Sequence, residues 1–299
     1  MDKRLGFIGL GNMGFPMAKN LLNTFGNLVV YNRSQQKCKE LERIGAVIAT
    51  SVYDFTQNTD IIFLSLPGPQ EVLEIVLGKD GILSCAHKGQ IIIDLSTVSP
   101  STNQIIVEKA QLLGVTYIDV PVSGGPQGAQ SSSLSLMIGA SEKEIDSLHL
   151  KDYLQVIGST FHYIGKRGGG SAIKIINNFM SFAGQVINGE ALLMADSLGI
   201  SPETFYQVTT TSSGNNVILK AKMNKVLNDD LKPGFALDLT VKDLELARQL
   251  CQDQMIPNYT LNIAIQFYRE AQKRGYGQND SSSVIRVIRG LDENNECSK

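Results

Sequence analysis

Short apolar runs alternate with segments of helical spacing along the first half of the chain. The apolar runs are rich in Ile, Val, Leu and Phe, and the segments between them place apolar side chains three or four positions apart. Strands that alternate with helices in this way are typical of a parallel, doubly wound sheet with helices on both faces. The predicted strands cover residues 4–9, 28–31, 46–49, 60–66, 90–94 and 116–120. We therefore expect an α/β domain over residues 1–165.

The hydrophobic pattern after this domain is helical. From Ile200 onward the apolar positions predict helices over residues 215–227, 239–255, 258–274 and 281–292, with no second strand-rich block. Ser201 and Pro202 supply an N-cap and a first-turn proline for a further helix that begins there. We expect an all-helical second domain over residues 166–299, joined to the first domain by one long helix.

The connecting helix is predicted within residues 165–198. Three glycines, Gly168 to Gly170, open a long run without proline, and most of its positions are apolar or small, so the helix should be buried almost all round. Polar residues recur at steps of three or four and so share one face. They are Ser171, Lys174, Asn178, Ser181, Gln185 and Asn188. We interpret the last three as a narrow solvent-facing stripe.

Lys174 is the residue on this face whose presence near the start of a helix is least expected. The helix macrodipole disfavours a cation near a helix N-terminus, and the preceding glycines let a ligand approach closely. Burial and the positive end of the dipole would both lower the pKa of the Lys174 side chain towards the working pH. General acid–base catalysis would explain such a lysine, with Asn178 beside it on the same face.

The turn after the first predicted strand reads GLGNMG and leads into a helical segment. This G-x-G-x-x-G pattern between a strand and a helix is typical of dinucleotide binding in a Rossmann-type fold. The first glycine permits a tight turn, the second lets backbone N–H groups reach a pyrophosphate, and the third lets helix and strand pack closely. The alternative is a plain glycine turn. The predicted cofactor contacts here are Gly9, Gly11, Asn12, Met13 and Gly14.

The second predicted strand ends in Asn32-Arg33-Ser34, where an NAD enzyme usually presents a carboxylate to the ribose 2′-hydroxyl. A guanidinium with hydroxyl and amide neighbours suits a 2′-phosphate better, because it binds phosphate through paired charge-assisted hydrogen bonds. The sequence therefore favours NADP over NAD. The alternative is that Arg33 is simply solvated and Ser34 only caps the next helix.

Three further strand ends lie where ligands bind in open α/β sheets. Leu66 and Pro67 follow one strand and Thr97 follows another, and each stretch reads equally well as an ordinary turn. The loop of residues 123–125, Ser-Gly-Gly, would expose successive N–H groups and a hydroxyl, which together make a nest for a carboxylate. Its alternative is a tight turn into residues 134–139. The predicted substrate-binding residues are Ser123, Gly124 and Gly125.

Composition narrows the classes of function. The 299 residues, 42% of them hydrophobic, are enough for two domains with proper cores. A net charge of −2 gives no field for nucleic acid or an anionic membrane, and no apolar run is long enough to span one, so we expect neither partner. The cysteines and histidines lack metal-ligand spacing, which predicts free thiols and no metal site. A first strand near Arg4 leaves no room for a signal peptide and favours a cytoplasmic protein; a removed organellar presequence is the open alternative.

Four stretches, taken in order, resemble the β-hydroxyacid dehydrogenase family, whose members include 3-hydroxyisobutyrate dehydrogenase and tartronate semialdehyde reductase. They are GFIGLGNMGFPMAKNLL, DVPVSGGPQGA, GKRGGGSAIKIINNFM and KDLELA. The resemblance implies a nicotinamide-binding domain and an all-helical domain, with homodimers or homotetramers. It also implies that Lys174 is the catalytic acid/base assisted by Asn178, that residues 123–125 bind the substrate carboxylate, and that Thr97 and Lys242 contact the cofactor.

The expected reaction moves a hydride between nicotinamide C4 and the oxygen-bearing carbon of a short hydroxy acid, while Lys174 gives or takes the proton. Two departures from the family pattern bear on this expectation. Asn32 replaces the aspartate of NAD-preferring members, and Ser132 replaces a glycine common in relatives. The alternatives are an NADPH-dependent glyoxylate or succinic semialdehyde reductase, an imine reductase on the same scaffold, and a non-catalytic dinucleotide-binding scaffold.

Overall fold

The computed structural model describes residues 3–291. The chain divides into two compact units, Met1–Lys174 and Ile175–Lys299. Within the described residues, no helix is both long enough and apolar enough to cross a membrane.

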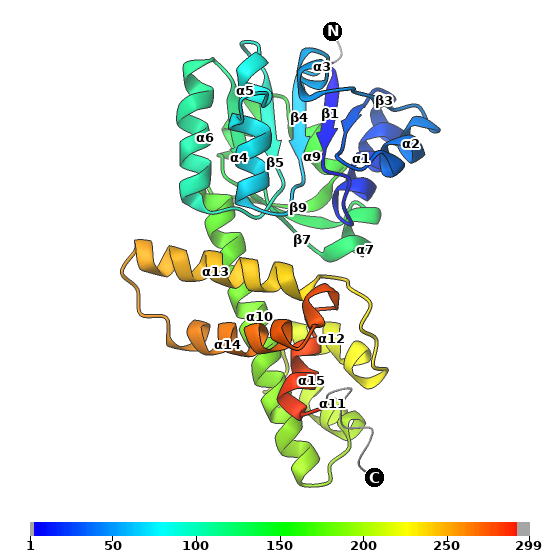
Figure 1. The fold of residues 1–299 in the computed structure, drawn as a ribbon, viewed down its shortest axis with the longest axis vertical. Helices are drawn as coiled ribbons and strands as arrows, with labels where there is room; N and C mark the ends of the chain where they lie inside the picture. Colours follow the sequence, from blue (N-terminus) through cyan, green and yellow to red (C-terminus); the bar gives the residue numbers. More distant parts are fainter. Residues whose placement is uncertain (1–2, 292–299) are drawn as a thin grey trace. The chain divides into compact units, whose positions relative to one another are not determined.

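The first unit is built on a six-stranded parallel sheet, as the alternating pattern predicts (Figure 1). The strand order is β3-β2-β1-β4-β5-β6, so the chain winds outward from β1 in one direction and then from β4 in the other. The carboxyl ends of all six strands therefore lie along one edge, and the reversal between β1 and β4 is where ligands bind in such sheets. The strands are β1 (Leu5–Ile8), β2 (Val29–Tyr31), β3 (Val47–Ile48), β4 (Ile61–Leu64), β5 (Ile91–Asp94) and β6 (Thr116–Asp119).

Both faces of this sheet are covered, which explains why its strands read as continuous apolar runs. Phe7 and Phe63 pack on one face against α1, α2 and a second small sheet. Ile8 and Ile62 pack on the other face against α3, α4, α5 and α6, which Figure 1 shows beside β4 and β5. These helices are α1 (Gly14–Phe25), α2 (Gln35–Glu42), α3 (Val52–Gln57), α4 (Pro69–Leu77), α5 (Ile82–Cys85) and α6 (Pro100–Leu112).

The second sheet of this unit has three strands and was not expected from the sequence. Its order is β7-β8-β9, with β7 antiparallel and β9 parallel to β8. The strand β9 carries mostly exposed or half-buried polar side chains, so it lacks the apolar run that marks the other strands. The elements are β7 (Val122–Ser123), α7 (Gly125–Gln130), β8 (Leu134–Ile138), α8 (Glu142–Ser147), α9 (Lys151–Gln155) and β9 (Gly158–Tyr163).

The predicted long helix exists as α10, which covers the 29 residues Gly169–Ser197. Its predicted burial is wrong. The apolar side chains of Ile176, Met180 and Ile187 are 44%, 69% and 57% exposed, whereas Gln185 is 0% and Asn188 is 8% exposed. The stripe that we interpreted as solvent-facing is thus largely buried, with Ser181 half-buried. Asn216, the N-cap residue of α12 (Val217–Leu227), accounts for part of this burial, because Asn188 and Asn216 exchange two hydrogen bonds between their amides.

The second unit is entirely helical in its described part, as predicted. Ser201 caps α11 by accepting a hydrogen bond from Thr204 N–H at 3.2 Å, and Pro202 occupies its first turn. The core is centred on the fully buried Tyr268, whose ring packs edge-on against Phe182. The remaining elements are α11 (Pro202–Thr210), α12 (Val217–Leu227), α13 (Leu237–Asp253), α14 (Tyr259–Lys273), the 3-10 turn η1 (Tyr276–Gln278) and α15 (Ser283–Arg289).

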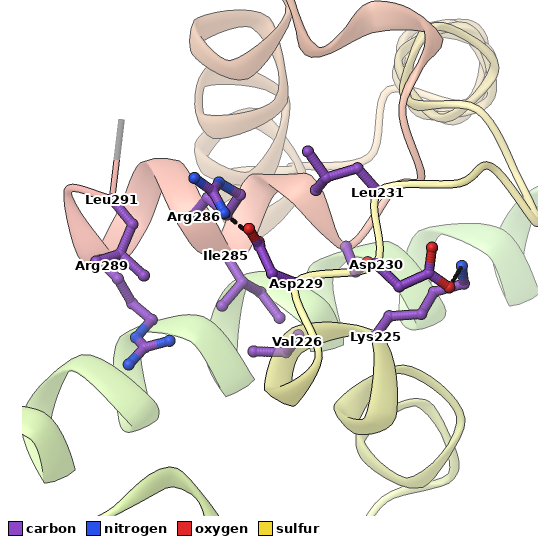
Figure 2. Close-up of a pocket in the computed structure, with 10 residues that line it drawn as sticks. Lys225, Val226, Asp229, Asp230, Leu231, Ile285, Arg286, Arg289 and Leu291 are labelled. Atoms are coloured by element: carbon purple, nitrogen blue, oxygen red, sulfur yellow. Dashed lines mark hydrogen bonds and ion pairs between the residues drawn. The ribbon is translucent and has the colours of Figure 1, made fainter. Parts of the chain in front are cut away.

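A small hollow, partly open to solvent, lies between the end of α12 and α15 (Figure 2). Its charged side chains are paired with one another or with near neighbours. Arg286 bonds to Asp229, and Lys225 Nζ lies 2.9 Å from Asp230 Oδ2. Arg289, at its rim, pairs with Asp196 at 2.6 Å. Because these charges neutralise one another, the hollow offers little to a charged ligand, and the candidate chemistry lies elsewhere.

Candidate active site

The glycine loop after β1 has the geometry that a bound pyrophosphate requires. Gly9 has a φ of +95°, and a Cβ there would lie 2.2 Å from the carbonyl oxygen of Ser65. A Cβ at Gly14, the first residue of α1, would lie 1.8 Å from Gly9 O, whereas a Cβ at Gly11 meets no atom within 4 Å. Gly9 and Gly14 therefore serve the tight turn and the packing, and the open side of Gly11 leaves the backbone accessible to phosphate. The residues fit a dinucleotide.

Asn32, at the end of β2, holds this loop in place. Its Oδ1 accepts a hydrogen bond from Leu10 N–H at 2.9 Å, and its Nδ2 donates to Ser34 O at 2.8 Å. Arg33 and Ser34 are exposed beside it. Ser34 is the N-cap residue of α2, but its hydroxyl makes no capping bond, and the first turn of α2 has no acidic residue. A guanidinium, a hydroxyl and a helix N-terminus are thus available together at this strand end.

Other predicted positions gather at the same edge of the sheet. Leu66 N–H donates to Ser96 Oγ at 2.9 Å and so ties the end of β4 to the end of β5. The Leu66 side chain lies 3.1 Å from where a Cβ at Gly9 would stand, against the glycine loop. Pro67 is exposed, and Thr97 is half-buried just after β5. The parallel topology brings all of these residues to the edge that carries the glycine loop.

The predicted carboxylate loop lies between β7 and α7. Gly124 and Gly125 have φ values of +131° and +65°, which only glycine adopts readily, and a Cβ at Gly125 would meet nothing within 4 Å. Ser123 precedes them, half-buried at the end of β7. Ser132, just after α7, donates its hydroxyl to Val156 O at 2.6 Å. The φ of Ser132 is +54°, a left-handed conformation that glycine adopts more readily than serine.

Lys174 and Asn178 lie one turn apart on α10 and are buried, at 9% and 5% exposed. Asn178 Nδ2 donates a 2.6 Å hydrogen bond to Asp243 Oδ2 on α13. Lys242 Nζ lies 2.8 Å from the other oxygen of the same carboxylate. Because a carboxylate only accepts, the amide nitrogen of Asn178 must face Asp243, and Asn178 Oδ1 accepts from Asn177 Nδ2 at 3.4 Å with one lone pair still unused.

Asp243 is a site residue that the sequence reasoning missed. It is 1% exposed and follows Thr240 on the buried face of α13, among Leu237, Leu244 and Ala247. The available signal was its spacing, since a carboxylate at an apolar position of a helical pattern needs a buried partner.

Residues 3–291 contain no cluster of metal-ligating side chains. No group of three or more His, Cys, Asp or Glu side chains in that range is arranged to hold an ion, and Cys297 lies outside it. Cys38, Cys85 and Cys251 are free thiols. The arrangement offers instead a dinucleotide loop, a carboxylate loop and a buried lysine.

Two family models together match most of the chain. Residues 4–165 match the NAD binding domain of 6-phosphogluconate dehydrogenase. Residues 168–288 match the NAD-binding domain of NADP-dependent 3-hydroxyisobutyrate dehydrogenase.

Named relatives match nearly the full chain. The 2-(hydroxymethyl)glutarate dehydrogenase of Eubacterium barkeri is 35% identical over 95% of this chain and 94% of its own length. Mitochondrial 3-hydroxyisobutyrate dehydrogenase of Rattus norvegicus is 32% identical over 95% and 87%. The NAD-dependent L-serine dehydrogenase of Pseudomonas aeruginosa is 30% identical over 96% and 98%.

Solved structures agree with these relatives. A Mycobacterium tuberculosis 3-hydroxyisobutyrate dehydrogenase with L-serine gives a TM-score of 0.87 at 26% identity, over 97% of this chain and all of that one. Psf3 in complex with NADP⁺ and 2-OPP gives 0.85 at 27% identity, over 95% and 99%.

Proposed function

Because the chain belongs to the β-hydroxyacid dehydrogenase family of NAD(P)-dependent oxidoreductases, we propose that it interconverts a short 3-hydroxy carboxylate and the matching semialdehyde, with NADPH favoured. The observation that carries this proposal is the burial of Lys174, one helical turn before an asparagine that Asp243 fixes. Three relatives are named for 2-(hydroxymethyl)glutarate, 3-hydroxyisobutyrate and serine. All three are carboxylates with a hydroxymethyl group on the neighbouring carbon, and we propose that class as the substrate.

The nicotinamide, when bound, supplies or accepts the hydride at the carbon that bears oxygen. In the reducing direction Lys174 Nζ–H gives its proton to the aldehyde oxygen as the C–H bond forms, so the product is the neutral alcohol. In the oxidising direction the neutral amine takes the hydroxyl proton. Asn178 Oδ1 accepts from the lysine or from the substrate hydroxyl and keeps the two in line. Lys174 and Asn178 are the proposed catalytic residues.

Substrate binding is proposed for the loop of Ser123, Gly124 and Gly125. Its positive-φ glycines and the Ser123 hydroxyl supply donors for a carboxylate, and the open side of Gly125 leaves room for it. We propose that the cofactor is held by the glycine loop and by the neighbouring strand ends. The loop residues are Gly9, Gly11, Asn12, Met13 and Gly14, and the strand-end residues are Asn32, Arg33, Ser34, Leu66, Pro67 and Thr97. Lys242 is assigned as a cofactor contact by resemblance. The domain boundary that we propose remains at residues 165/166.

The test is consumption of NADPH or NADH with a panel of small aldehydes, and reduction of NADP⁺ or NAD⁺ with the matching 3-hydroxy acids. We expect the fastest turnover with carboxylates that carry a hydroxymethyl or formyl group on the neighbouring carbon. Faster turnover of glyoxylate or succinic semialdehyde would move the assignment to those reductases. Turnover of cyclic imines alone would contradict the proposed reaction, and cofactor binding without any turnover would favour a non-catalytic scaffold.

We also propose that the protein is a homodimer or homotetramer built on the exposed face of α10. Met180, Ile187 and Met194 recur every seven residues and are 69%, 57% and 66% exposed, and a face of this kind is self-complementary when two copies meet. Ala191, a small residue, lies between Ile187 and Met194 and is half-buried.

Replacing Met180 and Ile187 together with glutamate should convert the oligomer to a monomer, because paired copies would bury four carboxylates without partners. Light scattering coupled to gel filtration gives the mass directly. Leu112→Glu is the matched control, since Leu112 is 87% exposed on α6 and should not change the mass. An unchanged mass in the double variant, or a monomeric native protein, would contradict this interface.

A cytoplasmic location is the final part of the proposal. The free thiols of Cys38, Cys85 and Cys251 suit a reducing compartment. The bacterial relatives named above are consistent with that location.

A further inference from the structure

A buried carboxylate from a distant part of the sequence caps the start of α10. Asp119, at the end of β6, is 1% exposed. Its Oδ1 accepts a hydrogen bond from Gly168 N–H at 2.8 Å, and its Oδ2 accepts from Ser171 N–H at 2.9 Å. These N–H groups belong to the helix start, where no preceding turn can supply acceptors. The contact therefore fixes the start of α10 at Gly169, and its second donor, Ser171, lies three residues before Lys174.

Two glycines make room for this carboxylate. A Cβ at Gly139 would lie 2.0 Å from Asp119 Oδ1, and a Cβ at Gly170 would lie 3.0 Å from Oδ2 and 2.1 Å from Met137 O. The side chain of Asp119 is thus enclosed by backbone on both sides. A carboxylate held this way cannot turn to another partner, so its two oxygens and its charge have one defined place.

The neighbours of Asp119 that carry or exchange charge come from several elements. Burial raises the pKa of the Asp119 carboxyl, and the two backbone N–H donors and the attraction of Arg167 oppose that rise. Arg167 donates to Gly139 O at 2.9 Å and pairs with Glu144 on α8. Asp94, at the end of β5, adds a like-charge interaction.

The side chain of Asp94 is itself in a buried chain of hydrogen bonds. Burial raises the pKa of the Asp94 carboxyl, and hydrogen bonds from Ser96 and Tyr117 oppose that rise. Tyr117 Oη lies 2.6 Å from Asp94 Oδ2 and 2.9 Å from Asn103 Oδ1, and Asn103 Nδ2 donates to Ser171 Oγ at 2.7 Å. Both buried acids are therefore linked to the first turn of α10 by hydrogen bonds. Asp119 bonds to it directly, and Asp94 is connected to it through the side chains of Tyr117 and Asn103.

We propose that Asp119 is a positioning residue for Lys174: it fixes the first turn of α10 and places a negative charge where the helix macrodipole would otherwise oppose the lysine's charge. The inference rests on the proposed function, because it matters only if Lys174 transfers the proton. A negative charge at a helix N-terminus favours a nearby ammonium over the neutral amine. Asp119 thereby raises the pH at which Lys174 gives up its proton.

The test compares two substitutions with opposite charge effects. Asp119→Asn keeps the size of the side chain and removes its negative charge, so the pH midpoint of kcat for aldehyde reduction should fall by about one unit. Arg167→Met removes a positive charge beside the Asp119 carboxylate and leaves Glu144 unpaired, so the field at Lys174 becomes more negative and the same midpoint should rise. Loosening of the helix start alone would not move the midpoint in opposite directions. The KM for NADPH should stay within about twofold in both variants.

Ser51→Ala provides a control for a lost cap. Ser51 Oγ accepts from Asp54 N–H at 3.0 Å at the start of α3, and its removal should leave the midpoint unchanged. Unchanged midpoints in both charge variants would overturn the role of Asp119. If Asp119→Asn does not fold, Arg167→Met decides, and the absence of an upward shift overturns the proposal. Failure of the proposed function is separate: it would appear as turnover retained in Lys174→Ala.

Discussion

Lys174→Ala is expected to lower kcat by at least about 10³-fold while NADPH binding stays nearly intact, because general acid–base catalysis contributes on that order. The alanine removes the proton donor from a buried position on α10, whereas the glycine loop and the ends of β2, β4 and β5 remain as they are. Single-turnover measurements with NADPH, together with titration of cofactor fluorescence, separate the two quantities.

Two further variants sharpen this prediction. Lys174→Arg keeps a positive charge that does not lose its proton near neutral pH, so it should be nearly as inactive as the alanine variant. Lys109→Ala, at an exposed position on α6, should turn over like the native protein. Turnover within about tenfold of native in Lys174→Ala would remove Lys174 from the mechanism.

The sequence predicted the first unit well where local chemistry determines structure. The strands of the parallel sheet are apolar because both faces are covered, and the G-x-G-x-x-G turn needs glycine for reasons visible at Gly9 and Gly14. The second sheet escaped prediction because β9 is an edge strand with exposed polar side chains. Such a strand can be recognised only from its pairing with β8, and the local sequence pattern carries no information about that pairing.

The burial of α10 could not be read from its composition. A helix with apolar residues on most sides can still have one side exposed to solvent, and the local sequence does not indicate which side the rest of the chain covers. Asn188 is buried because Asn216 meets it, and Asn178 because Asp243 does. Asp119 was missed for the same reason, since its partners at Gly168 and Ser171 are brought to it only by the fold. Asn188, which we assigned to solvent, therefore shows that a polar residue whose partner lies far along the chain is misplaced by a local pattern.

Arg33→Ala is expected to raise the KM for NADPH by about 10- to 100-fold with little change in kcat or in the KM for NADH. Arg33 is exposed at the end of β2 and makes no ion pair with any residue in the described range, so its guanidinium is available to a phosphate. Charge-assisted hydrogen bonds of this kind contribute about 1.5–3 kcal/mol, which corresponds to that change in affinity. The 2′-phosphate is remote from the transferred hydride, so ground state and transition state lose the same interaction.

The matched control lies at the far end of α2, and the converse variant lies at the same strand end as Arg33. Arg43→Ala, at the exposed far end of α2, removes the same charge and should leave both KM values unchanged. Asn32→Asp combined with Arg33→Ala should favour NADH, because an aspartate can still accept from Leu10 N–H while its second oxygen faces the ribose hydroxyls. The double variant loses the bond from Asn32 Nδ2 to Ser34 O, so some loss of loop stability should accompany the switch. Equal loss of NADPH and NADH affinity in Arg33→Ala would mean that Arg33 supports the loop rather than reading the phosphate, and the preference for NADPH would then need another source.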